Sequence, residues 1–304
     1  MIVTDPDAFL AEWSPARFPM RGPATARGAF LVTPASDVLA RESARDNRYM
    51  DLARAPDSQR ALAQHAELQR RLAADVPIVQ FAGDPAHPDG MFPNNVFATT
   101  PGQLVIGSMR HPVRQAEAGR GDIRGWFRGV LGYRETDLSL LPCVAELTGA
   151  LCIDRARGIG YCGLSERCDL AGACAMHAAF GLRLTFAFEL AEGEYHANVV
   201  LAILAGRAAL VAPSGFRDAR AAAAIARVYE GHVIELDSSQ KAAFAANAIA
   251  LAPDRAWFST AAADSLDAAQ RAGLERSGFS IGTADLDEVE KAGGSLRCCV
   301  AEIY

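Results

Sequence analysis

Short strand-like runs of apolar residues recur along the chain in pairs, and each pair is followed by a stretch with helical spacing. Asn95–Thr100 and Gln103–Met109 form the clearest pair, because the Pro101–Gly102 turn separates them. A helical pattern follows over Gln115–Val130, and a further strand is predicted near Asp137–Leu141. The pattern therefore predicts a unit made of a hairpin, a helix and a strand.

The same unit recurs three more times along the sequence. Each copy keeps the order of two strands, a helix and a strand. The predicted elements are Ala150–Asp154, Ile159–Gly163, Asp169–Phe180 and Leu182–Phe188 in the second copy, Tyr195–Leu204, Ala208–Ala212, Asp218–Tyr229 and Val233–Leu236 in the third, and Ala248–Ala252, Ala256–Ser259, Ala262–Arg276 and Phe279–Gly282 in the fourth.

A fifth unit is predicted to join the two ends of the chain. Leu296–Ile303 would pair with Phe30–Thr33, and the helix Ser58–Ala74 and the strand Pro77–Phe81 would complete it. The hairpins recur at roughly 45 to 55 residues, a spacing typical of radial or stacked repeats. Periodicity alone does not separate a closed ring from a layered α/β sheet. Because no linker rich in Pro, Gly or Ser divides the chain, we expect residues 1–304 to form a single α/β domain.

Composition narrows the class of protein. The chain has 304 residues, half of them apolar, and a net charge of −6 without a basic block, so nucleic acid is not expected as a partner. Val199–Leu204 is the densest apolar run and is far shorter than the roughly 18 to 20 residues of a membrane span. The amino-terminal segment is acidic and lacks the pattern of a secretory signal. We therefore expect a cytoplasmic protein with no membrane contact.

The cysteines indicate a reducing environment. Seven are present, and none lies in a CxxC arrangement. An odd number of scattered cysteines favours free thiols over a disulfide framework. The first five along the chain are typical of small buried hydrophobic residues. Because no metal-ligand spacing accompanies them, neither a metal nor another cofactor is predicted.

The unusual polar residues are concentrated in four short segments. Each segment lies at or near the start of a predicted hairpin, and equivalent positions in a ring of units would meet at one central cavity. The segments are Met91–Asn95 (MFPNN), Glu146–Gly149 (ELTG), Tyr195–Asn198 (YHAN) and Gly293–Cys299 (GGSLRCC).

These segments contain a thiol, an imidazole and a carboxylate, which together suit nucleophilic catalysis. A thiol attacks an electron-poor carbon as the thiolate, and a histidine can protonate a leaving amine and then deprotonate water. A carboxylate bonded to the imidazole would fix its tautomer. His196 and Asn198 are predicted to share one face of a strand, where a polar pair amid apolar neighbours indicates a pocket wall. The structural alternatives are a satisfied core histidine and, for Glu146, a solvated hairpin end.

Two adjacent cysteines compete for the role of nucleophile. On a strand, Cys298 and Cys299 would point to opposite faces. Cys299 would share its face with Ala301 and Ile303, an apolar set suited to packing. Strand alternation therefore favours Cys298.

Taken together, the four segments resemble those of the guanidino-group modifying enzymes, the pentein superfamily of arginine deiminases, dimethylarginine hydrolases and amidinotransferases. The likeness is greatest to the citrulline-utilisation hydrolases, in which FPNN, E-x-T-G, Y-H-x-N-V and a closing G-G-S-x-R-C occur in this order, and it extends from about Phe81 to the carboxyl terminus. The resemblance implies a five-bladed pseudo-symmetric α/β propeller. It also implies Cys298 as the nucleophile, His196 as the general acid and base, and Glu146 as the carboxylate beside the imidazole. At the position of Cys299, the enzymes that the chain resembles commonly have an apolar residue, so this cysteine departs from their pattern.

Asparagines stand where guanidinium-binding relatives usually carry acids, namely Asn94 or Asn95 in the first segment and Asn198 two residues after the histidine. An amide both donates and accepts hydrogen bonds, whereas a carboxylate only accepts them and suits a cation. We therefore hypothesise a neutral ureido substrate such as citrulline, hydrolysed to ornithine, ammonia and carbon dioxide. Arg110 and Arg114 are candidates for binding the substrate carboxylate. The structural alternatives are solvated helix-start charges for the arginines and turn formation for Asn94 and Asn95.

Two other functions are compatible with these residues. An arginine or methylarginine deiminase-type hydrolase, or an amidinotransferase, would use the same set, and transfer requires an amine in place of water. A non-catalytic binding protein of the same fold is the third hypothesis, against which the joint presence of Cys298, His196 and Glu146 argues. A small amino acid is the predicted partner, and a homodimer is left open.

Overall fold

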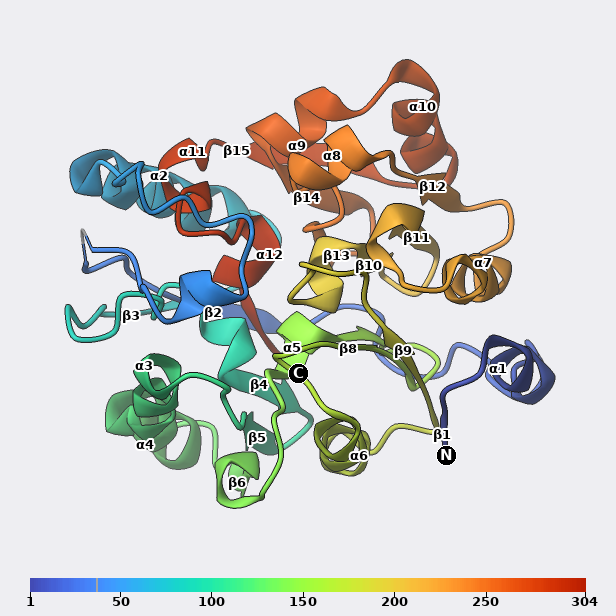
Figure 1. Cartoon of the computed structure of the whole chain (residues 1–304), viewed down its shortest axis with the longest axis horizontal. Coiled ribbons are helices and arrows are strands. Elements are labelled where there is room, and N and C mark those ends of the chain that lie inside the picture. Colours follow the sequence, from blue (N-terminus) through green and yellow to red (C-terminus); the bar gives the residue numbers. More distant parts are fainter. Residues whose placement is uncertain (37) are drawn as a thin grey trace.

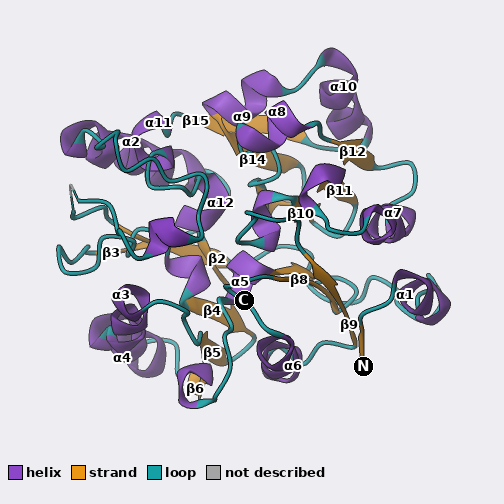
Figure 2. Ribbon diagram, viewed as in Figure 1, coloured by secondary structure: helices purple, strands orange, loops and turns teal. Residues whose placement is uncertain are grey.

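The computed structural model describes residues 1–36 and 38–304. Within these residues the strands form five separate small sheets, and the longer helices lie outside them (Figures 1 and 2). The sheets surround a central region in which short helical turns lie (Figure 1). The chain thus has a mixed α/β fold, as the sequence predicts.

The sheet that contains the clearest predicted hairpin shows how each unit is built. β4 (Phe97–Thr100) and β5 (Gln103–Ile106) pair antiparallel. After the helices α3 (Pro112–Gln115) and α4 (Gly121–Gly129), β6 (Arg134–Asp137) returns and pairs in parallel with β5. The order of hairpin, helix and strand is the one predicted from the sequence.

Three further sheets repeat this arrangement. In each, the first two strands are antiparallel, and the strand after the helix pairs in parallel with the second. Their elements are β7 (Leu151–Asp154), β8 (Ile159–Leu164), α6 (Leu170–Ala179) and β9 (Leu184–Glu189); β10 (Leu201–Leu204), β11 (Ala208–Val211), α7 (Ala219–Val228) and β12 (Val233–Glu235); and, after α8 (Ser238–Ala242), β13 (Ile249–Ala252), β14 (Arg255–Ser259), α9 (Thr260–Ser265), α10 (Ala268–Arg276) and β15 (Ser280–Ala284).

An additional strand was not expected from the sequence pattern. β1 (Ile2–Val3) pairs in parallel with β9 at the edge of its sheet, and α1 (Pro6–Glu12) follows it. A strand of two residues is too short to produce a period-two pattern, so the sequence carried no signal for it.

The fifth sheet joins segments from the two ends of the sequence, as predicted. β16 (Ala301–Ile303) pairs antiparallel with β2 (Gly28–Val32), which pairs in parallel with β3 (Ile78–Phe81). The helix α2 (Ser58–Leu72) connects β2 to β3. Two short helices precede β16, namely α11 (Asp287–Glu290) and α12 (Leu296–Cys299).

Aspartate side chains cap the amino termini of several outer helices. Asp57 accepts hydrogen bonds from two backbone N–H groups at the start of α2, and Asp218 caps α7. At α10, Asp267 and Gln270 form a reciprocal capping box. Each cap satisfies N–H groups that the helix leaves unpaired and stabilises it by about 1 kcal/mol.

The core is built from the strands and the inner faces of the helices. Leu68 and Leu72 of α2 are fully buried and lie one helical turn apart. Phe30 of β2 packs edge-on against Phe127 of α4, with 5.4 Å between the ring centroids. This contact belongs to an apolar cluster that includes β2, β4 and β5, so neighbouring units share one packed interior.

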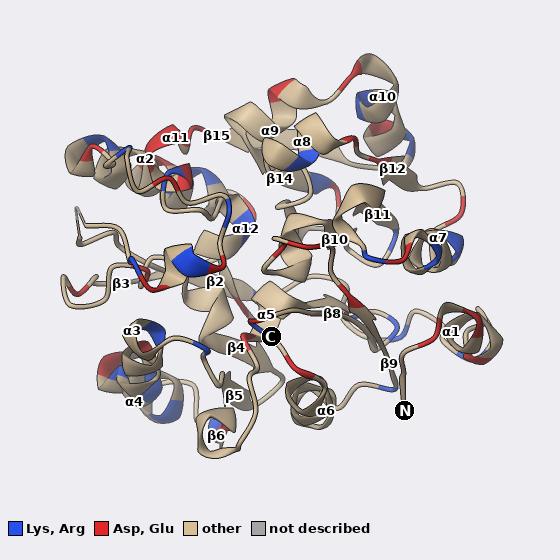
Figure 3. Ribbon diagram, in the orientation of Figure 1, with Lys and Arg blue, Asp and Glu red and all other residues tan. Residues whose placement is uncertain are grey.

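Charged side chains of both signs are spread over the outer helices and loops (Figure 3). This distribution leaves the strands largely apolar (Figure 3). Among the described residues, none of the helices is long and apolar enough to cross a membrane.

Two helices expected to be continuous are divided. The helix predicted at Gln115–Val130 is interrupted at Arg120 (φ −58°, ψ 91°), which lies between two glycines and separates α4 from the turns before it. The helix predicted at Ala262–Arg276 ends at Leu266, and Asp267 then caps α10. Glycine and a capping aspartate both favour helix boundaries, which the hydrophobic period alone did not reveal.

Three predicted strands also differ from those in the structure. The strand expected at Asp137–Leu141 lies earlier, because residues 138–140 form a 3-10 turn after β6. Within Tyr195–Leu204 and Leu296–Ile303, only the second half of each segment is a strand. The first halves are helical turns, and these turns carry the polar residues of interest.

Candidate active site

Four short helical turns meet near the centre of the fold, and each precedes the first strand of a different hairpin or edge pair. They are the 3-10 turns η2 (Pro93–Asn95) and η5 (Ala197–Val199) and the helices α5 (Leu147–Ala150) and α12. α5 contacts both η2 and η5, and α12 contacts η2. The four polar segments of the sequence therefore lie together, as their equivalent positions in the repeat predict.

Cys298 and His196 line one cavity. Both side chains are buried in its wall. Asn95 lines the same cavity and comes from a third segment. A thiol and an imidazole from distant parts of the sequence thus face a shared space, which is the geometric requirement for the predicted chemistry.

The imidazole of His196 is held by the carboxylate of Glu146. His196 Nε2 lies 2.9 Å from Glu146 Oε2, and both side chains are fully buried. Neither the solvated hairpin end nor the satisfied core histidine describes this pair, because His196 Nδ1 has no hydrogen-bond partner within the described residues. Nδ1 is therefore the ring nitrogen that the described residues leave without a hydrogen bond.

His196 reaches this position by a route that differs from the prediction. It is the N-cap of η5 and has an extended backbone, and Asn198 lies within the turn. Strand alternation therefore does not place the two side chains on one face, and that part of the prediction is wrong. The turn brings Asn198 Nδ2 to 3.2 Å from the Thr148 carbonyl oxygen.

Charges around the pair favour an ionised carboxylate and a neutral imidazole. Burial alone would raise the pKa of Glu146, but Arg167 and His196 hold this pKa well below its usual range. Burial lowers the pKa of His196, and Glu146 only partly opposes the shift. At neutral pH the pair is therefore a carboxylate beside an uncharged ring.

Arg167 is the main counter-ion of Glu146. Its Nη1 lies 3.2 Å from Glu146 Oε2, and its Nη2 lies 2.6 Å from Asp46 Oδ1. Nη2 also donates to the carbonyl oxygen of Ser43. Arg167 thus holds the segment of residues 43–46 against the Glu146 carboxylate.

The Cys298 thiol is buried on α12 and faces side-chain amides. Its Sγ lies 3.3 Å from Asn247 Nδ2 and 3.8 Å from Asn198 Nδ2. Burial raises the pKa of Cys298, and hydrogen bonds from the Ser295 backbone and then from the Asn247 amide oppose this shift. The Cys298 thiol is therefore protonated at neutral pH in this structure.

Cys299 is also buried but does not line the cavity. Cys298 and Cys299 lie on a helical turn, so the prediction that strand alternation separates them is wrong. Successive residues of a helix point about 100° apart, which is enough to direct one thiol into the cavity and the other into the core.

Asn95 and Asn94 differ in their surroundings. Asn95 lines the cavity, and its Oδ1 has no hydrogen-bond partner among residues 1–36 and 38–304. Asn94 is buried but does not belong to the lining. A Cβ atom added at Gly149 would lie 2.5 Å from Asn95 Oδ1 and 2.7 Å from His196 Nδ1. Glycine at this position therefore allows the first three segments to approach one another.

The two arginines predicted to bind substrate have different positions. Arg114 is buried, lines the cavity and forms a bidentate pair with Glu117, with Nη2 2.8 Å from Oε2. The Arg110 side chain is half exposed, does not line the cavity and pairs with Glu166 at 3.3 Å. The structure therefore does not bring the Arg110 side chain to the cavity, and its backbone N–H is the group that reaches the site, 3.1 Å from Glu146 Oε1.

Asp89 adds a carboxylate to the wall of the cavity. It is buried, and its Oδ2 accepts a hydrogen bond from the Ser43 hydroxyl. Burial raises the pKa of Asp89, and the nearby Arg114 guanidinium opposes this shift. Acidic and basic groups thus occur together at one side of the cavity.

Sequence reasoning missed three residues of this site, namely Asp89, Arg167 and Asn247. Asp89 and Arg167 lie outside the four segments, and isolated charged residues carry no distinctive pattern. A signal for Asn247 was present, because it lies two residues before β13 and so occupies the position in the fourth unit that the polar segments occupy in the others.

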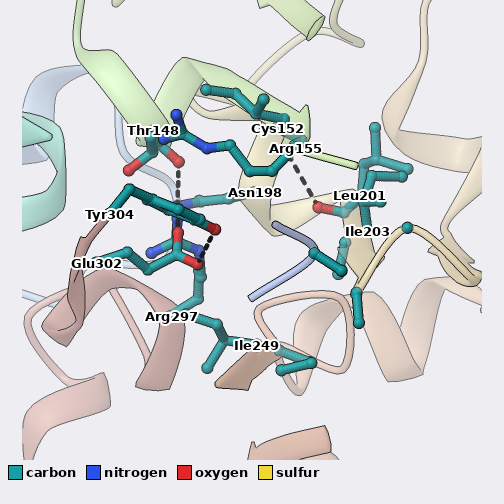
Figure 4. Close-up of a pocket in the computed structure, with 17 residues that line it drawn as sticks. Thr148, Cys152, Arg155, Asn198, Leu201, Ile203, Ile249, Arg297, Glu302 and Tyr304 are labelled. Atoms are coloured by element: carbon teal, nitrogen blue, oxygen red, sulfur yellow. Dashed lines mark hydrogen bonds and ion pairs between the residues drawn. The ribbon is translucent and has the colours of Figure 1, made fainter. Parts of the chain in front are cut away.

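Asn198 also borders a second cavity. Its lining includes Thr148, Arg155, Arg297, Glu302 and Tyr304 (Figure 4). Arg297 and Glu302 form an ion pair of 2.9 Å, and the Tyr304 hydroxyl donates to the same carboxylate (Figure 4). Among the described residues, neither cavity contains a group of three or more His, Cys, Asp or Glu side chains that could hold a metal ion.

The family described as N,N dimethylarginine dimethylhydrolase, eukaryotic, matches residues 33–304 of the chain. The chain belongs to this family. Members of the dimethylarginine dimethylhydrolase family are hydrolases of the guanidino-modifying pentein superfamily, so the chain is an enzyme that cleaves C–N bonds. No curated protein matches the sequence.

Solved structures support the dimethylarginine dimethylhydrolase family at the level of the fold. The amino-terminal domain of ArgZ, an arginine dihydrolase from the ornithine-ammonia cycle in cyanobacteria, matches with a TM-score of 0.79 and 20% identity, covering 91% of this chain and 97% of that domain. AgrE in complex with ornithine and NAD⁺ gives the same TM-score and identity, but the match covers 39% of its chain. A dimethylarginine dimethylaminohydrolase in an adduct with S-methyl-L-thiocitrulline matches at a TM-score of 0.71 and 20% identity, covering 91% of this chain and all of the other.

Proposed function

We propose that this enzyme hydrolyses the ureido group of citrulline, with Cys298 as the nucleophile, His196 as the general acid and base, and Glu146 as the carboxylate that orients the imidazole. The observation that carries the proposal is the shared cavity of Cys298 and His196, together with the 2.9 Å contact between His196 and Glu146. A thiol and a base that line one cavity, with a carboxylate bonded to the base, form the constellation that covalent hydrolysis requires.

The reaction proceeds in two half-reactions. Cys298 transfers its proton to His196 and attacks the ureido carbon, so that an S–C bond forms as a C–N bond breaks and His196 protonates the departing amine. Water then adds to the thiocarbamate carbon, its proton passes to His196, and the C–S bond breaks. The carbamic acid that is released decomposes, and the sum is citrulline and water giving ornithine, ammonia and carbon dioxide.

The amides of Asn95 and Asn198 favour a ureido group over a guanidinium. Asn95 lines the cavity with an unpaired amide oxygen, and Asn198 lies beside the thiol. A ureido group is neutral and presents one carbonyl oxygen and several N–H donors, which amides can match. A guanidinium at the same place would need a carboxylate, because a buried cation without a counter-ion is strongly disfavoured.

The charged residues on the cavity wall suit the other end of an amino acid. Arg114 and Arg167 offer guanidinium groups for an α-carboxylate, and Asp89 offers a carboxylate for an α-ammonium group. Because each of the three groups already has protein partners, a zwitterion would add to a balanced network and would not leave a single buried charge.

A guanidino substrate is the second candidate, and the family and its neighbours support it. The family is described by its action on dimethylarginine, and ArgZ is an arginine dihydrolase. In this alternative the same thiol attacks a guanidino carbon in a deiminase-type reaction, or passes an amidino group to an amine. A catalytic constellation of this kind argues against a non-catalytic binding protein.

We further propose that the five sheets are the blades of one closed, pseudo-symmetric α/β propeller and that residues 1–304 form a single domain. The pairing of β16 with β2 supports both statements, because it joins the last unit to the first. The free cysteines of the described residues support a reducing compartment such as the cytoplasm.

The test is a comparison of turnover with citrulline, arginine and dimethylarginine, in which ornithine and ammonia are quantified and Cys298→Ser serves as the blank. We expect kcat/KM for citrulline to exceed that for arginine by about tenfold or more. This is the usual cost of one charged group, here the guanidinium, that lacks a charged partner in the cavity. Equal or faster turnover of arginine would reject citrulline in favour of the guanidino alternative. A product formed only when glycine or ornithine is present would indicate amidino transfer.

A further inference from the structure

Asn247 is a buried side chain at the start of the fourth unit, where it meets the nucleophile. It lies just before β13 and is the only side chain of that turn with a hydrogen bond to Cys298 among the described residues. In the other units the equivalent turn carries Asn95, Glu146, His196 or Cys298. By its place in the repeat, Asn247 therefore belongs to the same central constellation.

The contacts of Asn247 determine which way its amide faces. Its Oδ1 accepts a hydrogen bond from the Cys298 backbone N–H at 3.3 Å, a contact that only the oxygen of the amide can make. Its Nδ2 donates to the Asn198 carbonyl oxygen at 3.0 Å. Both contacts require the same orientation, so the Nδ2 group is the one that lies 3.3 Å from the Cys298 sulfur. An N–H donor is thus aimed at the nucleophile.

The sulfur needs such a donor because its surroundings otherwise disfavour a negative charge. The thiol is buried, and the His196 ring is paired with Glu146 through Nε2. The donors near the sulfur are neutral groups, namely a backbone N–H at Ser295 and the side-chain amides of Asn247, with Nδ2 at 3.3 Å, and Asn198, with Nδ2 at 3.8 Å. A fixed N–H group next to a buried anion stabilises it far more than the same group would in water.

We propose that Asn247 is a further catalytic residue, which donates a hydrogen bond to the Cys298 thiolate when the thiol loses its proton and again when the sulfur departs from the covalent intermediate. This inference rests on the proposed function, because that function supplies the reaction in which the thiolate takes part. The orientation of the amide rests on geometry alone. A structural anchor for α12 would need only the bond from the Cys298 N–H to Oδ1, and it would not require a donor at the sulfur.

The variant Asn247→Asp separates these two roles. It keeps the shape and the oxygen that accepts the Cys298 N–H, but it replaces the donor by a carboxylate oxygen. Asn247→Ala removes the donor without adding a charge and serves as the second variant if the aspartate prevents folding. Cys299→Ser is the common background, so that labelling at the adjacent position reports only on Cys298.

The experiment measures the rate of alkylation of Cys298 by iodoacetamide from pH 6 to 11, with mass spectrometry to locate the label and thermal unfolding to show that each variant is folded. We expect the thiol pKa to rise by one unit or more in both variants, so that alkylation near neutral pH slows by about tenfold or more. The turnover number should fall by a similar factor, with little change in KM.

An unchanged thiol pKa in a folded variant would overturn the proposal and leave Asn247 as an anchor for α12. A raised thiol pKa in the variants would support it even if the wild-type enzyme fails to hydrolyse citrulline, because alkylation does not depend on the substrate. Failure of the wild-type enzyme to hydrolyse citrulline would reject the proposed function but not the role of Asn247. The failure of either proposal can therefore be recognised separately.

Discussion

Glu146 Oε2 lies 2.9 Å from His196 Nε2, and neither side chain is exposed to solvent. This contact orients the ring, and Nδ1 has no hydrogen-bond partner among the described residues. Glu146→Gln keeps an oxygen acceptor but removes the charge that balances Arg167. We therefore expect kcat to fall by about 100-fold, the usual contribution of general acid and base catalysis. Ammonia release and thermal unfolding would check this, and a kcat within twofold of the wild type would show that the pair is only structural.

The two adjacent cysteines should differ sharply in their effect on turnover. Cys298 lines the cavity, whereas Cys299 is packed in the core. Cys298→Ser should abolish measurable activity, because a hydroxyl at neutral pH is a far weaker nucleophile than a thiolate. Cys299→Ser should retain activity within a few fold. Parallel assays of the two purified variants decide the matter, and the opposite ranking would identify Cys299 as the nucleophile.

Gly149 should tolerate no side chain. An added Cβ would lie 2.5 Å from Asn95 Oδ1 and 2.7 Å from His196 Nδ1, so Gly149→Ala must displace one of them. A displacement of about 1 Å at a catalytic group can cost about 100-fold in rate, and we expect a loss of kcat/KM of that order.

Gly125→Ala provides the matched control for this change. Gly125 lies within α4, and an added Cβ there meets no atom within 4 Å. Because alanine favours a helix over glycine by about 0.5 to 1 kcal/mol, this variant should be slightly more stable and fully active. Equal kinetics for the two variants would mean that the close approach at Gly149 has no role in catalysis.

Asn95 should influence the choice between ureido and guanidino substrates. Asn95→Asp places a carboxylate on the cavity wall, where it can pair with a guanidinium but loses the amide donor for a ureido oxygen. We expect the ratio of kcat/KM for citrulline to that for arginine to fall by about tenfold or more. Steady-state kinetics with both amino acids measure the ratio, and a ratio that stays constant would remove Asn95 from the recognition of the substrate.

His65 should make the enzyme sensitive to acid. It is buried on α2, and burial lowers its pKa from 6.5 to about 4. The unfolded chain therefore binds a proton at this residue below pH 6.5 while the folded chain does not, so its contribution to stability is complete above pH 6.5 and is lost as the pH falls towards 4. The loss amounts to about 3 kcal/mol.

Replacing the imidazole by an apolar group tests this linkage. In His65→Leu, the free energy of unfolding should decrease less between pH 7 and pH 4 than it does in the wild type. Urea unfolding at several pH values in this range measures the difference. Parallel curves for the two proteins would assign the acid sensitivity to other groups.

The order of the elements could be predicted from the sequence, because the strands of each unit are apolar runs bounded by turn residues. The pairing of Leu296–Ile303 with Phe30–Thr33 also followed from counting units, and β16 and β2 form this pair. The exact structure around the site could not be predicted from period-two patterns. His196 caps one single helical turn and Cys298 lies in another, each just before a strand, and a turn of three or four residues is too short to leave a periodic signal.

The polar residues of the four segments were found because they interrupt apolar runs. Asp89 and Arg167 were missed for the opposite reason, since charged residues in loops are common and their burial depends on tertiary packing. Arg110 was misplaced because the residues that follow a strand can face either side. The structure distinguishes Arg110 from Arg114 by their different partners, Glu166 at the surface and Glu117 in the interior.

The sheet of β16, β2 and β3 has a consequence for how the enzyme matures. Phe30 pairs with Ala301, so this sheet closes a loop that contains nearly all of the chain. Contacts between such distant residues carry a high entropic cost and are expected to form late during folding. The turn that carries Cys298 comes directly before β16. In folding intermediates that lack the pairing of β16 with β2, Cys298 would not yet lie near His196. Such intermediates are expected to be catalytically inactive.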